Sequence, residues 1–379
     1  MRSLETIRGE IDSIDDQLAS LIKKRTALSC EVALSKRESG RCIGDPARER
    51  NIMTRVTENA DPHSERALRL VFSTLFGMSR ARQREKLIGE TELSRRIDAA
   101  RQEAFPKRAV VACAGIEGSF AQQATSLIFP IPTIIYFNSF EKVFEAVERG
   151  LCPYGILPVE NSAAGSVSAV YDLMQRHRFH IVRSLRLKVD HVLLAPHGVK
   201  FSDVREVVSH PHALTQCSQF LKAHPDIKAV PSSNTAVAAK AVAESDRRDV
   251  AVIASRSCAE LYGLEILRES VADAAFNYTR FICIAKDLAV YPDADKISLM
   301  LGLPHRPGAL NQIISKFAAV DVNLTKLESR PLPGQDFEFN FIFDFEADLN
   351  SEPVRSLLSE LSTDPEIERF TFLGAYAEK

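Results

Sequence analysis

The chain has 379 residues, 45% of them hydrophobic and 26% charged, which is long enough for two or three domains with buried cores. Its 48 basic and 50 acidic residues nearly cancel, so no chain-wide positive charge argues for binding to nucleic acid. Seven cysteines without a CxxC pair predict reduced thiols, and a charged N-terminus with no apolar run of about 20 residues predicts a cytoplasmic protein without a signal peptide or membrane span.

The first 95 residues follow a helical pattern. Apolar residues recur at three- and four-residue steps from Ile7 to Val32, and no proline occurs before Pro46, so the first helix is expected to run for about 35 residues. Asp45 and the following proline are typical of the N-cap and first position of a second helix. A further break precedes a third helix over roughly 64–94. Because a small monomeric bundle does not cover a helix as long as the first, we expect a homodimer or a higher homo-oligomer.

The rest of the chain divides at two breaks. Residues 96–107 are polar and are expected to form a linker. Over 108–290, short apolar strands alternate with helical stretches, which predicts an α/β domain. After a second break around Pro292, residues 296–379 follow a β-α-β-β-α-β order, which is the order of a ferredoxin-like α+β domain. The sequence therefore predicts a multidomain chain in which an all-α domain of residues 1–95 precedes these two.

Cations are placed regularly along the first predicted helix. Arg25 and Lys36 are eleven residues apart, so they share a helix face about 16 Å apart and could converge on one small anion. Arg8 is turned by about 100° from Arg25, so it would more easily serve the site of a partner in an antiparallel dimer. The alternative for any one of these cations alone is that it is an ordinary solvent-exposed charge on a helix surface.

Eight polar residues of the helical segment resemble the pattern of the all-helical chorismate mutase family. They are Arg8, Arg25, Lys36, Asp45, Arg48, Glu49, Ser79 and Gln83. The resemblance implies that arginines and a serine engage the substrate carboxylates, with the first arginine supplied by the other protomer; these residues are Arg8, Arg25, Arg48 and Ser79. It also implies contacts from Lys36 and Gln83 to the ether oxygen of chorismate. Glu49 and Asp45 would lie near the ring hydroxyl.

The chemistry of that family explains the residue types. The rearrangement of chorismate to prephenate needs no nucleophile and no proton transfer. It needs the flexible enolpyruvyl arm to be fixed over the ring, which bidentate arginine–carboxylate contacts achieve. It also needs positive charge where the breaking C–O bond gathers negative charge, which Lys36 and a Gln83 donor would supply.

Five motifs of the middle segment resemble prephenate dehydratase, in the same order along the chain. They are GILPVENSAAGSV (155–167), VVSHPHALTQC (207–217), SNTAVAAKAVAE (233–244), VAVIASRSCAELYGLEIL (250–267) and NYTRF (277–281). The resemblance implies two α/β subdomains around a cleft, similar to a periplasmic binding protein, with the chain crossing between them twice. Two positions depart from the family pattern: Ala114-Gly115-Ile116 replaces a Gly-Pro pair, and His212 stands where Gln or Glu is common.

A polar run ends the apolar stretch of the first motif. Glu160, Asn161 and Ser162 would lie beyond the carboxyl end of a strand, where α/β sheets bind ligands. Gly165 would let the backbone approach the substrate. The alternative for Ser162 is structural, as the cap of the helix that follows.

Loss of carbon dioxide and hydroxide from prephenate requires a proton or a strong hydrogen bond at the leaving hydroxyl. The resemblance makes Thr279 the key hydroxyl, which we expect to donate with little net transfer, and makes Arg280 a carboxylate anchor. Glu160 is the alternative acid, provided that a dry cleft raises its pKa. Ser209, Gln216 and Asn161 would complete the polar lining.

Neither reaction requires a metal or another cofactor. His210 and His212 lie close together in the sequence, but no third ligand has suitable spacing, so no metal site is expected.

The last segment resembles an ACT domain of the phenylalanine-binding kind. The residues that carry this resemblance are Gly308, Ala309 and Leu310, with Glu328, Ser329 and Arg330. Gly308 would open a helix whose N–H groups can receive the carboxylate of L-phenylalanine, and the strand with Glu328 would make edge contacts across a dimer interface. Asn311 replaces the usual β-branched apolar residue. The alternative is a purely architectural dimerisation module.

Together these resemblances predict a bifunctional enzyme, a chorismate mutase (isomerase) and prephenate dehydratase (carbon–oxygen lyase), with L-phenylalanine as its effector. One alternative keeps the dehydratase and gives the helical segment only a role in dimerisation. The other is a ligand-responsive DNA-binding regulator, which would need a helix-turn-helix between short helices and a salt-dependent affinity for DNA. The long first helix and the net charge of -2 speak against the regulator.

Overall fold

The computed structural model describes residues 2–274, 276–332 and 338–379. The chain forms two compact units. The first unit consists of residues 1–96, 302–322 and 350–370, and the second of residues 97–301, 323–349 and 371–379. Residues of the predicted domain 296–379 occur in both units, with its two helices in the first and most of its strand residues in the second.

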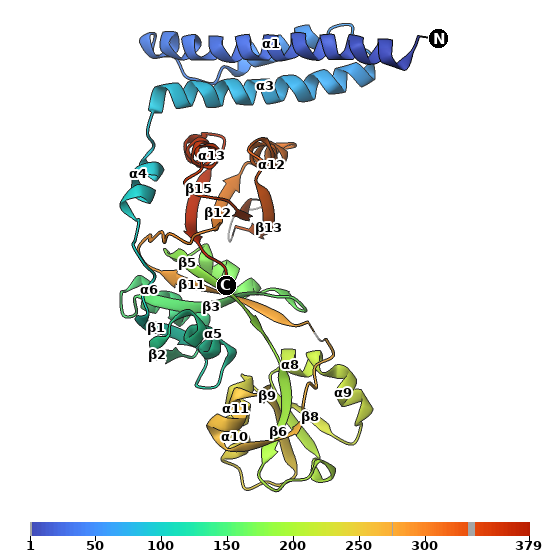
Figure 1. The fold of residues 1–379 in the computed structure, drawn as a ribbon, viewed down its shortest axis with the longest axis vertical. Coiled ribbons are helices and arrows are strands. Elements are labelled where there is room, and N and C mark those ends of the chain that lie inside the picture. The colour runs from blue at the N-terminus through green and yellow to red at the C-terminus, as the bar shows by residue number, and fades with distance from the viewer. Residues whose placement is uncertain (1, 275, 333–337) are drawn as a thin grey trace. The chain divides into compact units, whose positions relative to one another are not determined.

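The first unit begins with three helices, as predicted. They are α1 (Leu4–Glu38), α2 (Pro46–Thr57) and α3 (Pro62–Ile88), and α1 and α3 pack side by side (Figure 1). The predicted length of the first helix is confirmed by the 35 residues of α1. Asp45 caps α2 with Pro46 at its first turn, also as predicted. The predicted end of the third helix near residue 94 is wrong, because Gly89 takes a φ of 64° and ends α3 at Ile88.

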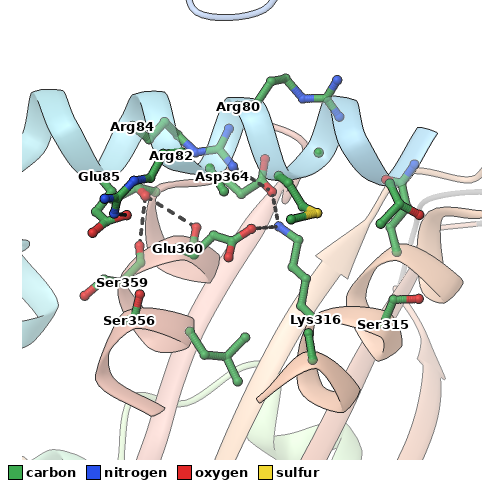
Figure 2. Close-up of a pocket in the computed structure, with 18 of the residues that line it drawn as sticks. Arg80, Arg82, Arg84, Glu85, Ser315, Lys316, Ser356, Ser359, Glu360 and Asp364 are labelled. Carbon is green, nitrogen blue, oxygen red and sulfur yellow. Dashed lines mark hydrogen bonds and ion pairs between the residues drawn. The ribbon is translucent and has the colours of Figure 1, made fainter. Parts of the chain in front are cut away.

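A groove of about 1020 Å³ lies in the first unit between α3 and the helices α12 (Ala309–Ala319) and α13 (Glu352–Thr363). Ion pairs connect several of the side chains that line it (Figure 2). Asp364, at the end of α13, lies 3.2 Å from Arg84 of α3 and 2.6 Å from Lys316 of α12, and Lys316 also lies 2.7 Å from Glu360. The side chains of Arg84 and Asp364 are only 6% and 8% exposed. Removing either one would therefore leave the other as an uncompensated buried charge, which is destabilising.

The second unit contains two open sheets with helices packed on them. The strands of the first sheet are β1 (Arg108–Ala114), β2 (Ile131–Phe137), β3 (Tyr154–Asn161), β4 (Gly165–Ser166), β5 (His180–Lys188) and β11 (Tyr278–Ala285). Their order is β2-β1-β3-β11-β5, with β4 paired to β3. The helices of this part are α5 (Phe120–Ile128), α6 (Phe140–Glu148) and α7 (Ser168–Met174).

The second sheet has the order β10-β6-β9-β7-β8. Its strands are β6 (His191–Pro196), β7 (Glu206–Ser209), β8 (Lys228–Pro231), β9 (Val250–Ser255) and β10 (Leu264–Arg268). The short 3₁₀ helix η1 (Phe201–Asp203) and the helices α8 (Pro211–Gln216), α9 (Ser218–Ala223), α10 (Thr235–Ala243) and α11 (Ser257–Tyr262) complete it. The chain passes from β5 to β6 and returns from β10 to β11, so the predicted double crossing between the sheets is confirmed.

The end of the chain has the predicted β-α-β-β-α-β order. Its strands are β12 (Lys296–Leu303), β13 (Asn323–Pro331), β14 (Phe339–Glu346) and β15 (Arg369–Tyr376). They form a four-stranded sheet in the order β13-β14-β12-β15. β13 is therefore an edge strand of this sheet.

The predicted linker of residues 96–107 is not free of structure. The helix α4 (Glu92–Ala99) reaches into it, and Gln102 N–H donates to Val290 O at 2.9 Å. The ring of Phe105 packs against Phe129 and Tyr291. This segment is therefore fastened to the core of the second unit by apolar contacts that the polar composition concealed.

None of the helices in the described part of the chain combines the length and apolar content that crossing a bilayer requires.

Acid should weaken the first unit through Asp364. Burial alone would raise the pKa of Asp364, but its ion pairs with Lys316 and Arg84 outweigh burial and lower the pKa. A lowered pKa adds stability above the unfolded value of about 3.9, and this stability is lost as the pH falls through the folded value. Asp364→Asn should therefore cost about 3 kcal/mol at pH 7 and should flatten the loss of stability below about pH 4.

Thermal unfolding of the full chain between pH 3 and pH 7 measures this. Glu85→Gln is the control, because Glu85 is more than half exposed and pairs only with Arg82 of the same helix in the described structure. Equal acid sensitivity of Asp364→Asn and the parent protein would contradict the prediction.

Candidate active sites

Two residues of the predicted helical site meet between α1 and α3. The guanidinium Nη1 of Arg25 donates to Ser79 Oγ at 2.5 Å and to Leu75 O at 2.9 Å. Burial lowers the pKa of Arg25, and the charge of Glu49 opposes this effect. Gln83 lies one turn beyond Ser79 on the same helix, as the i, i+4 spacing predicted. Its side chain is 6% exposed, and its Oε1 has no hydrogen-bond partner among the described residues.

The other residues of the predicted helical set lie around this pair. The Nζ of Lys36 donates to Ile43 O, in the loop before α2. Glu49 accepts two hydrogen bonds from Nη1 of Arg80, at 2.6 and 2.7 Å. Arg80 was not among the predicted residues. The only indication in the sequence is that Glu49, as a carboxylate in a packed helical segment, needs a cationic partner.

Three predicted residues do not reach this place within the chain. Asp45 accepts from Arg48 N at 2.9 Å as the cap of α2, and the side chain of Arg48 is exposed. Arg8 is exposed on α1, seventeen residues or about 25 Å along the helix from Arg25. The outer face of α1 also exposes large apolar side chains at 40–62% of their surface: Leu4, Ile7, Ile11, Ile14, Leu18, Leu21, Leu28 and Val32.

A hydrogen-bonded cluster of side chains lies at the ends of β3 and β11 in the second unit. Asn161 and Thr279 are register partners, and Asn161 Nδ2 donates to Thr279 Oγ1 at 3.0 Å. Nδ2 also donates to Asn277 Oδ1 at 2.7 Å. Asn161 Oδ1 accepts from the backbone N–H groups of Ala163 and Ala164, at 3.0 and 2.9 Å. Since backbone N–H groups can only donate, the orientation of the Asn161 amide is determined, and Thr279 Oγ1 is an acceptor here.

Gln216 joins this cluster from α8 of the second sheet. Its Nε2 donates to Asn161 Oδ1 at 3.3 Å, and its Oε1 accepts from Asn277 Nδ2 at 3.2 Å. The Nε2 of His191 lies 3.0 Å from the same Oε1. The structure therefore brings together three of the predicted residues, Asn161, Gln216 and Thr279. Asn277 and His191 were not singled out, although Asn277 opens one of the quoted motifs.

Glu160 and Arg280 face away from this cluster. They are register partners of each other, one position from Asn161 and Thr279, so the alternation of strand side chains places them on the opposite face. Arg280 is 7% exposed and forms ion pairs with Asp344 at 2.5 Å and Glu378 at 2.8 Å. This guanidinium is therefore already held by two carboxylates, and its predicted role as a carboxylate anchor stays a prediction.

Glu160 is partly exposed and ion-paired in this structure. Its side chain is 41% exposed, and its Oε2 lies 3.1 Å from Nζ of Lys326 on β13. Its predicted role as an acid stays a prediction.

Two predicted serines have backbone partners. Ser162 Oγ accepts from Tyr278 N at 2.9 Å, so it fastens the β3–β4 turn to the start of β11. The alternative that Ser162 caps a helix is wrong, because α7 begins only at Ser168. Gly165 has a φ of 79° in the same turn, a conformation that glycine favours. Ser209, at the end of β7, is fully buried and donates to Ile253 O at 2.6 Å.

The predicted regulatory residues lie on α12 and β13. Gly308, with a φ of 84°, is the N-cap of α12, which continues with Ala309 and Leu310. On β13, Glu328 Oε2 accepts from Ser166 Oγ at 2.8 Å, and Arg330 Nη2 donates to Ser168 Oγ at 3.0 Å. Ser329 is exposed on the other face of the strand.

The histidines His210 and His212 stack at a centroid distance of 5.4 Å. Nδ1 of His210 accepts from His212 N at 3.2 Å, as the cap of α8. Burial, and then the charge of His212, lower the pKa of His210. The described residues contain no group of three or more His, Cys, Asp or Glu side chains that could hold a metal ion.

Comparisons with known proteins match both parts of the chain. The family described as chorismate mutase type II matches residues 7–84, and the family described as prephenate dehydratase matches residues 111–289. The bifunctional chorismate mutase/prephenate dehydratase of Escherichia coli (strain K12) is 30% identical, over 98% of this chain and 96% of that protein.

Two further relatives match most of the chain. The arogenate dehydratase/prephenate dehydratase 2 of Arabidopsis thaliana is 36% identical over 67% of this chain and 69% of that protein. The crystal structure of prephenate dehydratase from Arthrobacter aurescens in complex with L-Phe is 30% identical, with a TM-score of 0.65, and covers 71% of this chain and 89% of that chain.

Proposed function

The chain belongs to the family of bifunctional chorismate mutase/prephenate dehydratases, and from this premise we propose how its two activities are built. It rearranges chorismate to prephenate, and it then dehydrates and decarboxylates prephenate to phenylpyruvate in the biosynthesis of phenylalanine. We assign the mutase to residues 1–95, the dehydratase to 108–290, and a ferredoxin-like ACT domain to 296–379. The observation that carries the proposal is the match of both catalytic segments in one chain.

The mutase site is proposed between α1 and α3. Arg25, braced by Ser79, provides a fixed guanidinium for a carboxylate of chorismate. Gln83 is buried one turn from Ser79, and its side-chain NH2 group is the donor that can serve the ether oxygen once a substrate is bound. The ammonium of Lys36 donates to Ile43 O, and its two further N–H groups can donate to a substrate oxygen.

A second copy of the chain is proposed to complete this site. The outer face of α1 exposes eight large apolar side chains in one helical stripe, which is more apolar surface than a helix normally leaves in water. Arg8 lies on the same helix, about 25 Å from Arg25, too far to serve the same substrate. An antiparallel partner would cover the stripe and bring its own Arg8 to the site. We therefore propose a homodimer.

Lys36→Ala should abolish most of the mutase activity and spare the dehydratase. Removing the cation from the breaking C–O bond should lower kcat/KM for chorismate about 100-fold or more. Conversion of chorismate to prephenate and of added prephenate to phenylpyruvate are measured separately on the same purified protein. Lys24→Ala is the matched control, because Lys24 is exposed on the same helix. An unchanged rate with chorismate would refute the site and leave the helical segment with a dimerisation role only.

The dehydratase chemistry is proposed to depend on the direction of the Thr279 proton. Because Asn161 donates to Thr279 Oγ1, the hydroxyl proton of Thr279 does not point at Asn161 and is free to donate to a substrate. Donation to the departing hydroxyl stabilises the charge that gathers there, and aromatisation of the ring drives the loss of carbon dioxide. The second N–H of Gln216 Nε2 adds a further donor for an anionic substrate.

Prephenate is proposed as the substrate in preference to arogenate, which the plant relative also has in its name. The reason lies in the chain itself. Its mutase segment produces prephenate, and the dehydratase segment follows on the same polypeptide. Arogenate carries an ammonium group in place of the side-chain keto group, and side by side assays with the two substrates measure the preference.

Thr279→Val should remove the dehydratase activity without altering the shape of the side chain. The loss of one positioned donor costs about 100- to 1,000-fold in kcat, whereas the mutase rate of the same protein should not change. Thr215→Val is the control, because Thr215 is exposed and bonded only to the backbone of Pro211 in the described structure. If Thr279→Val makes phenylpyruvate at the parent rate, Thr279 has no role in the reaction.

Feedback by phenylalanine is proposed to act through β13. The predicted effector residues Glu328 and Arg330 share a strand face with Lys326, since strand side chains alternate. Lys326 Nζ contacts Glu160 at 3.1 Å and Ser166 Oγ at 3.2 Å, and Glu160 precedes Asn161 directly. A shift of β13 on effector binding would therefore move the end of β3 that carries Asn161.

Lys326→Met should weaken this coupling and leave the uninhibited dehydratase rate near the parent value. Coupling free energies between sites are typically 1–3 kcal/mol, so half-inhibition should need about fivefold more phenylalanine or beyond. Lys240→Met is the control, because Lys240 pairs with Glu244 within one exposed helix face. Identical inhibition curves for Lys326→Met and the parent protein would show that the coupling runs elsewhere.

A further inference from the structure

His191 lies behind the dehydratase cluster, at the first position of β6. Its side chain is buried, with the residue 2% exposed, and Phe120 contacts the ring edge-on at 5.7 Å between centroids. The backbone is held as well, since His191 pairs with Ser255 of β9 and its carbonyl accepts from Val271 N at 3.0 Å. The ring is therefore fixed in one orientation.

The only side-chain hydrogen bond of this ring among the described residues is to Gln216. Nε2 lies 3.0 Å from Gln216 Oε1, while the buried Nδ1 has no partner among these residues. A buried imidazole with one partner is a costly way to fill space that an aliphatic side chain could fill. This indicates that the hydrogen bond to Gln216 is the reason for a histidine at this position.

The direction of that hydrogen bond follows from the rest of the cluster. The backbone N–H groups of Ala163 and Ala164 make Asn161 Oδ1 an acceptor, so the Gln216 nitrogen must be the group that faces it. The Gln216 oxygen then faces His191, and His191 must carry its proton on Nε2. Burial lowers the pKa of His191, against the hydrogen bond with Gln216 and the charge of Asp190, which is consistent with a neutral ring that donates from Nε2.

We propose that His191 is a positioning residue of the dehydratase, which holds the Gln216 amide with its NH2 group toward Asn161 and the substrate. This inference rests on the proposed function. Prephenate is a dianion, so an amide turned by 180° would present its oxygen to negative charge and to Asn161 Oδ1, and would repel both. His191 and Asn277 together occupy the Gln216 oxygen and prevent that rotation.

His191→Leu should lower the dehydratase kcat/KM about tenfold or more, because the Gln216 oxygen loses one of the two donors that fix the orientation of the amide. His191→Gln, which can place a side-chain N–H near the former Nε2, should restore the value to within about threefold of the parent. That rescue separates positioning from acid–base catalysis, because glutamine does not titrate. His197→Leu is the matched control, since His197 follows the same strand with its side chain 75% exposed.

A double-mutant cycle tests whether His191 acts through Gln216. In a Gln216→Leu background, the further change His191→Leu should have almost no effect. A full tenfold loss in that background would overturn the proposal, and so would a His191→Gln protein as impaired as His191→Leu, or an unimpaired His191→Leu.

Two readouts keep these outcomes separate from other failures. The mutase rate of each variant reports whether the chain is intact, and thermal unfolding reports whether His191→Leu still folds. If His191→Leu does not fold, the dehydratase kcat/KM of His191→Gln is compared with that of Gln216→Leu, and a His191→Gln protein as impaired as Gln216→Leu overturns the proposal. Thr279→Val is assayed in parallel. Full activity of Thr279→Val overturns the proposed function, whereas an inactive Thr279→Val with a normal His191→Leu overturns only the role of His191.

Discussion

The register between β3 and β11 determines most of the dehydratase site. This pairing sets Asn161 opposite Thr279 and, one step along, Glu160 opposite Arg280. Because strand side chains alternate between faces, the first pair joins the amide cluster, and the second pair joins the charged layer with Lys326, Asp344 and other groups. A slip of one residue would break both pairs, setting Asn161 opposite Arg280 or Glu160 opposite Thr279, and would place a charged side chain where the proposed reaction needs a neutral hydroxyl. The backbone pairing of β3 with β11 therefore determines which side chains can take part in the proposed reaction.

The sequence predicted the elements well and the roles of adjacent residues less well. The period of apolar residues and the prolines located α1, the start of α2 and the β-α-β-β-α-β order of the last segment, because these signals are local. Local signals do not say which face of a strand meets the substrate. Glu160 and Arg280 were therefore assigned to the site with their neighbours Asn161 and Thr279, and the structure separates them.

The residues that the sequence did not single out all act through partners that only the tertiary structure supplies. Arg80 matters because Glu49 lies on a different helix, and His191 matters because Gln216 lies on α8. Buried polar groups must find hydrogen-bond partners, but the sequence does not say which. For α1 the sequence showed the stripe of apolar residues, but it did not show what covers them. In the single chain these side chains lie exposed.

The segments that join the two sheets of the second unit run beside the amide cluster. Val189, on the way out to β6, donates its N–H to the carbonyl of Asn277 at 2.7 Å, on the way back to β11. The two connections are thus fastened together next to the residues that orient Thr279. A hinge at this point would move the outer rims of the two lobes furthest and the amides least, since displacement grows with distance from the axis of rotation. Such a pivot would let a bulky anion come and go while the groups that act on it stay assembled.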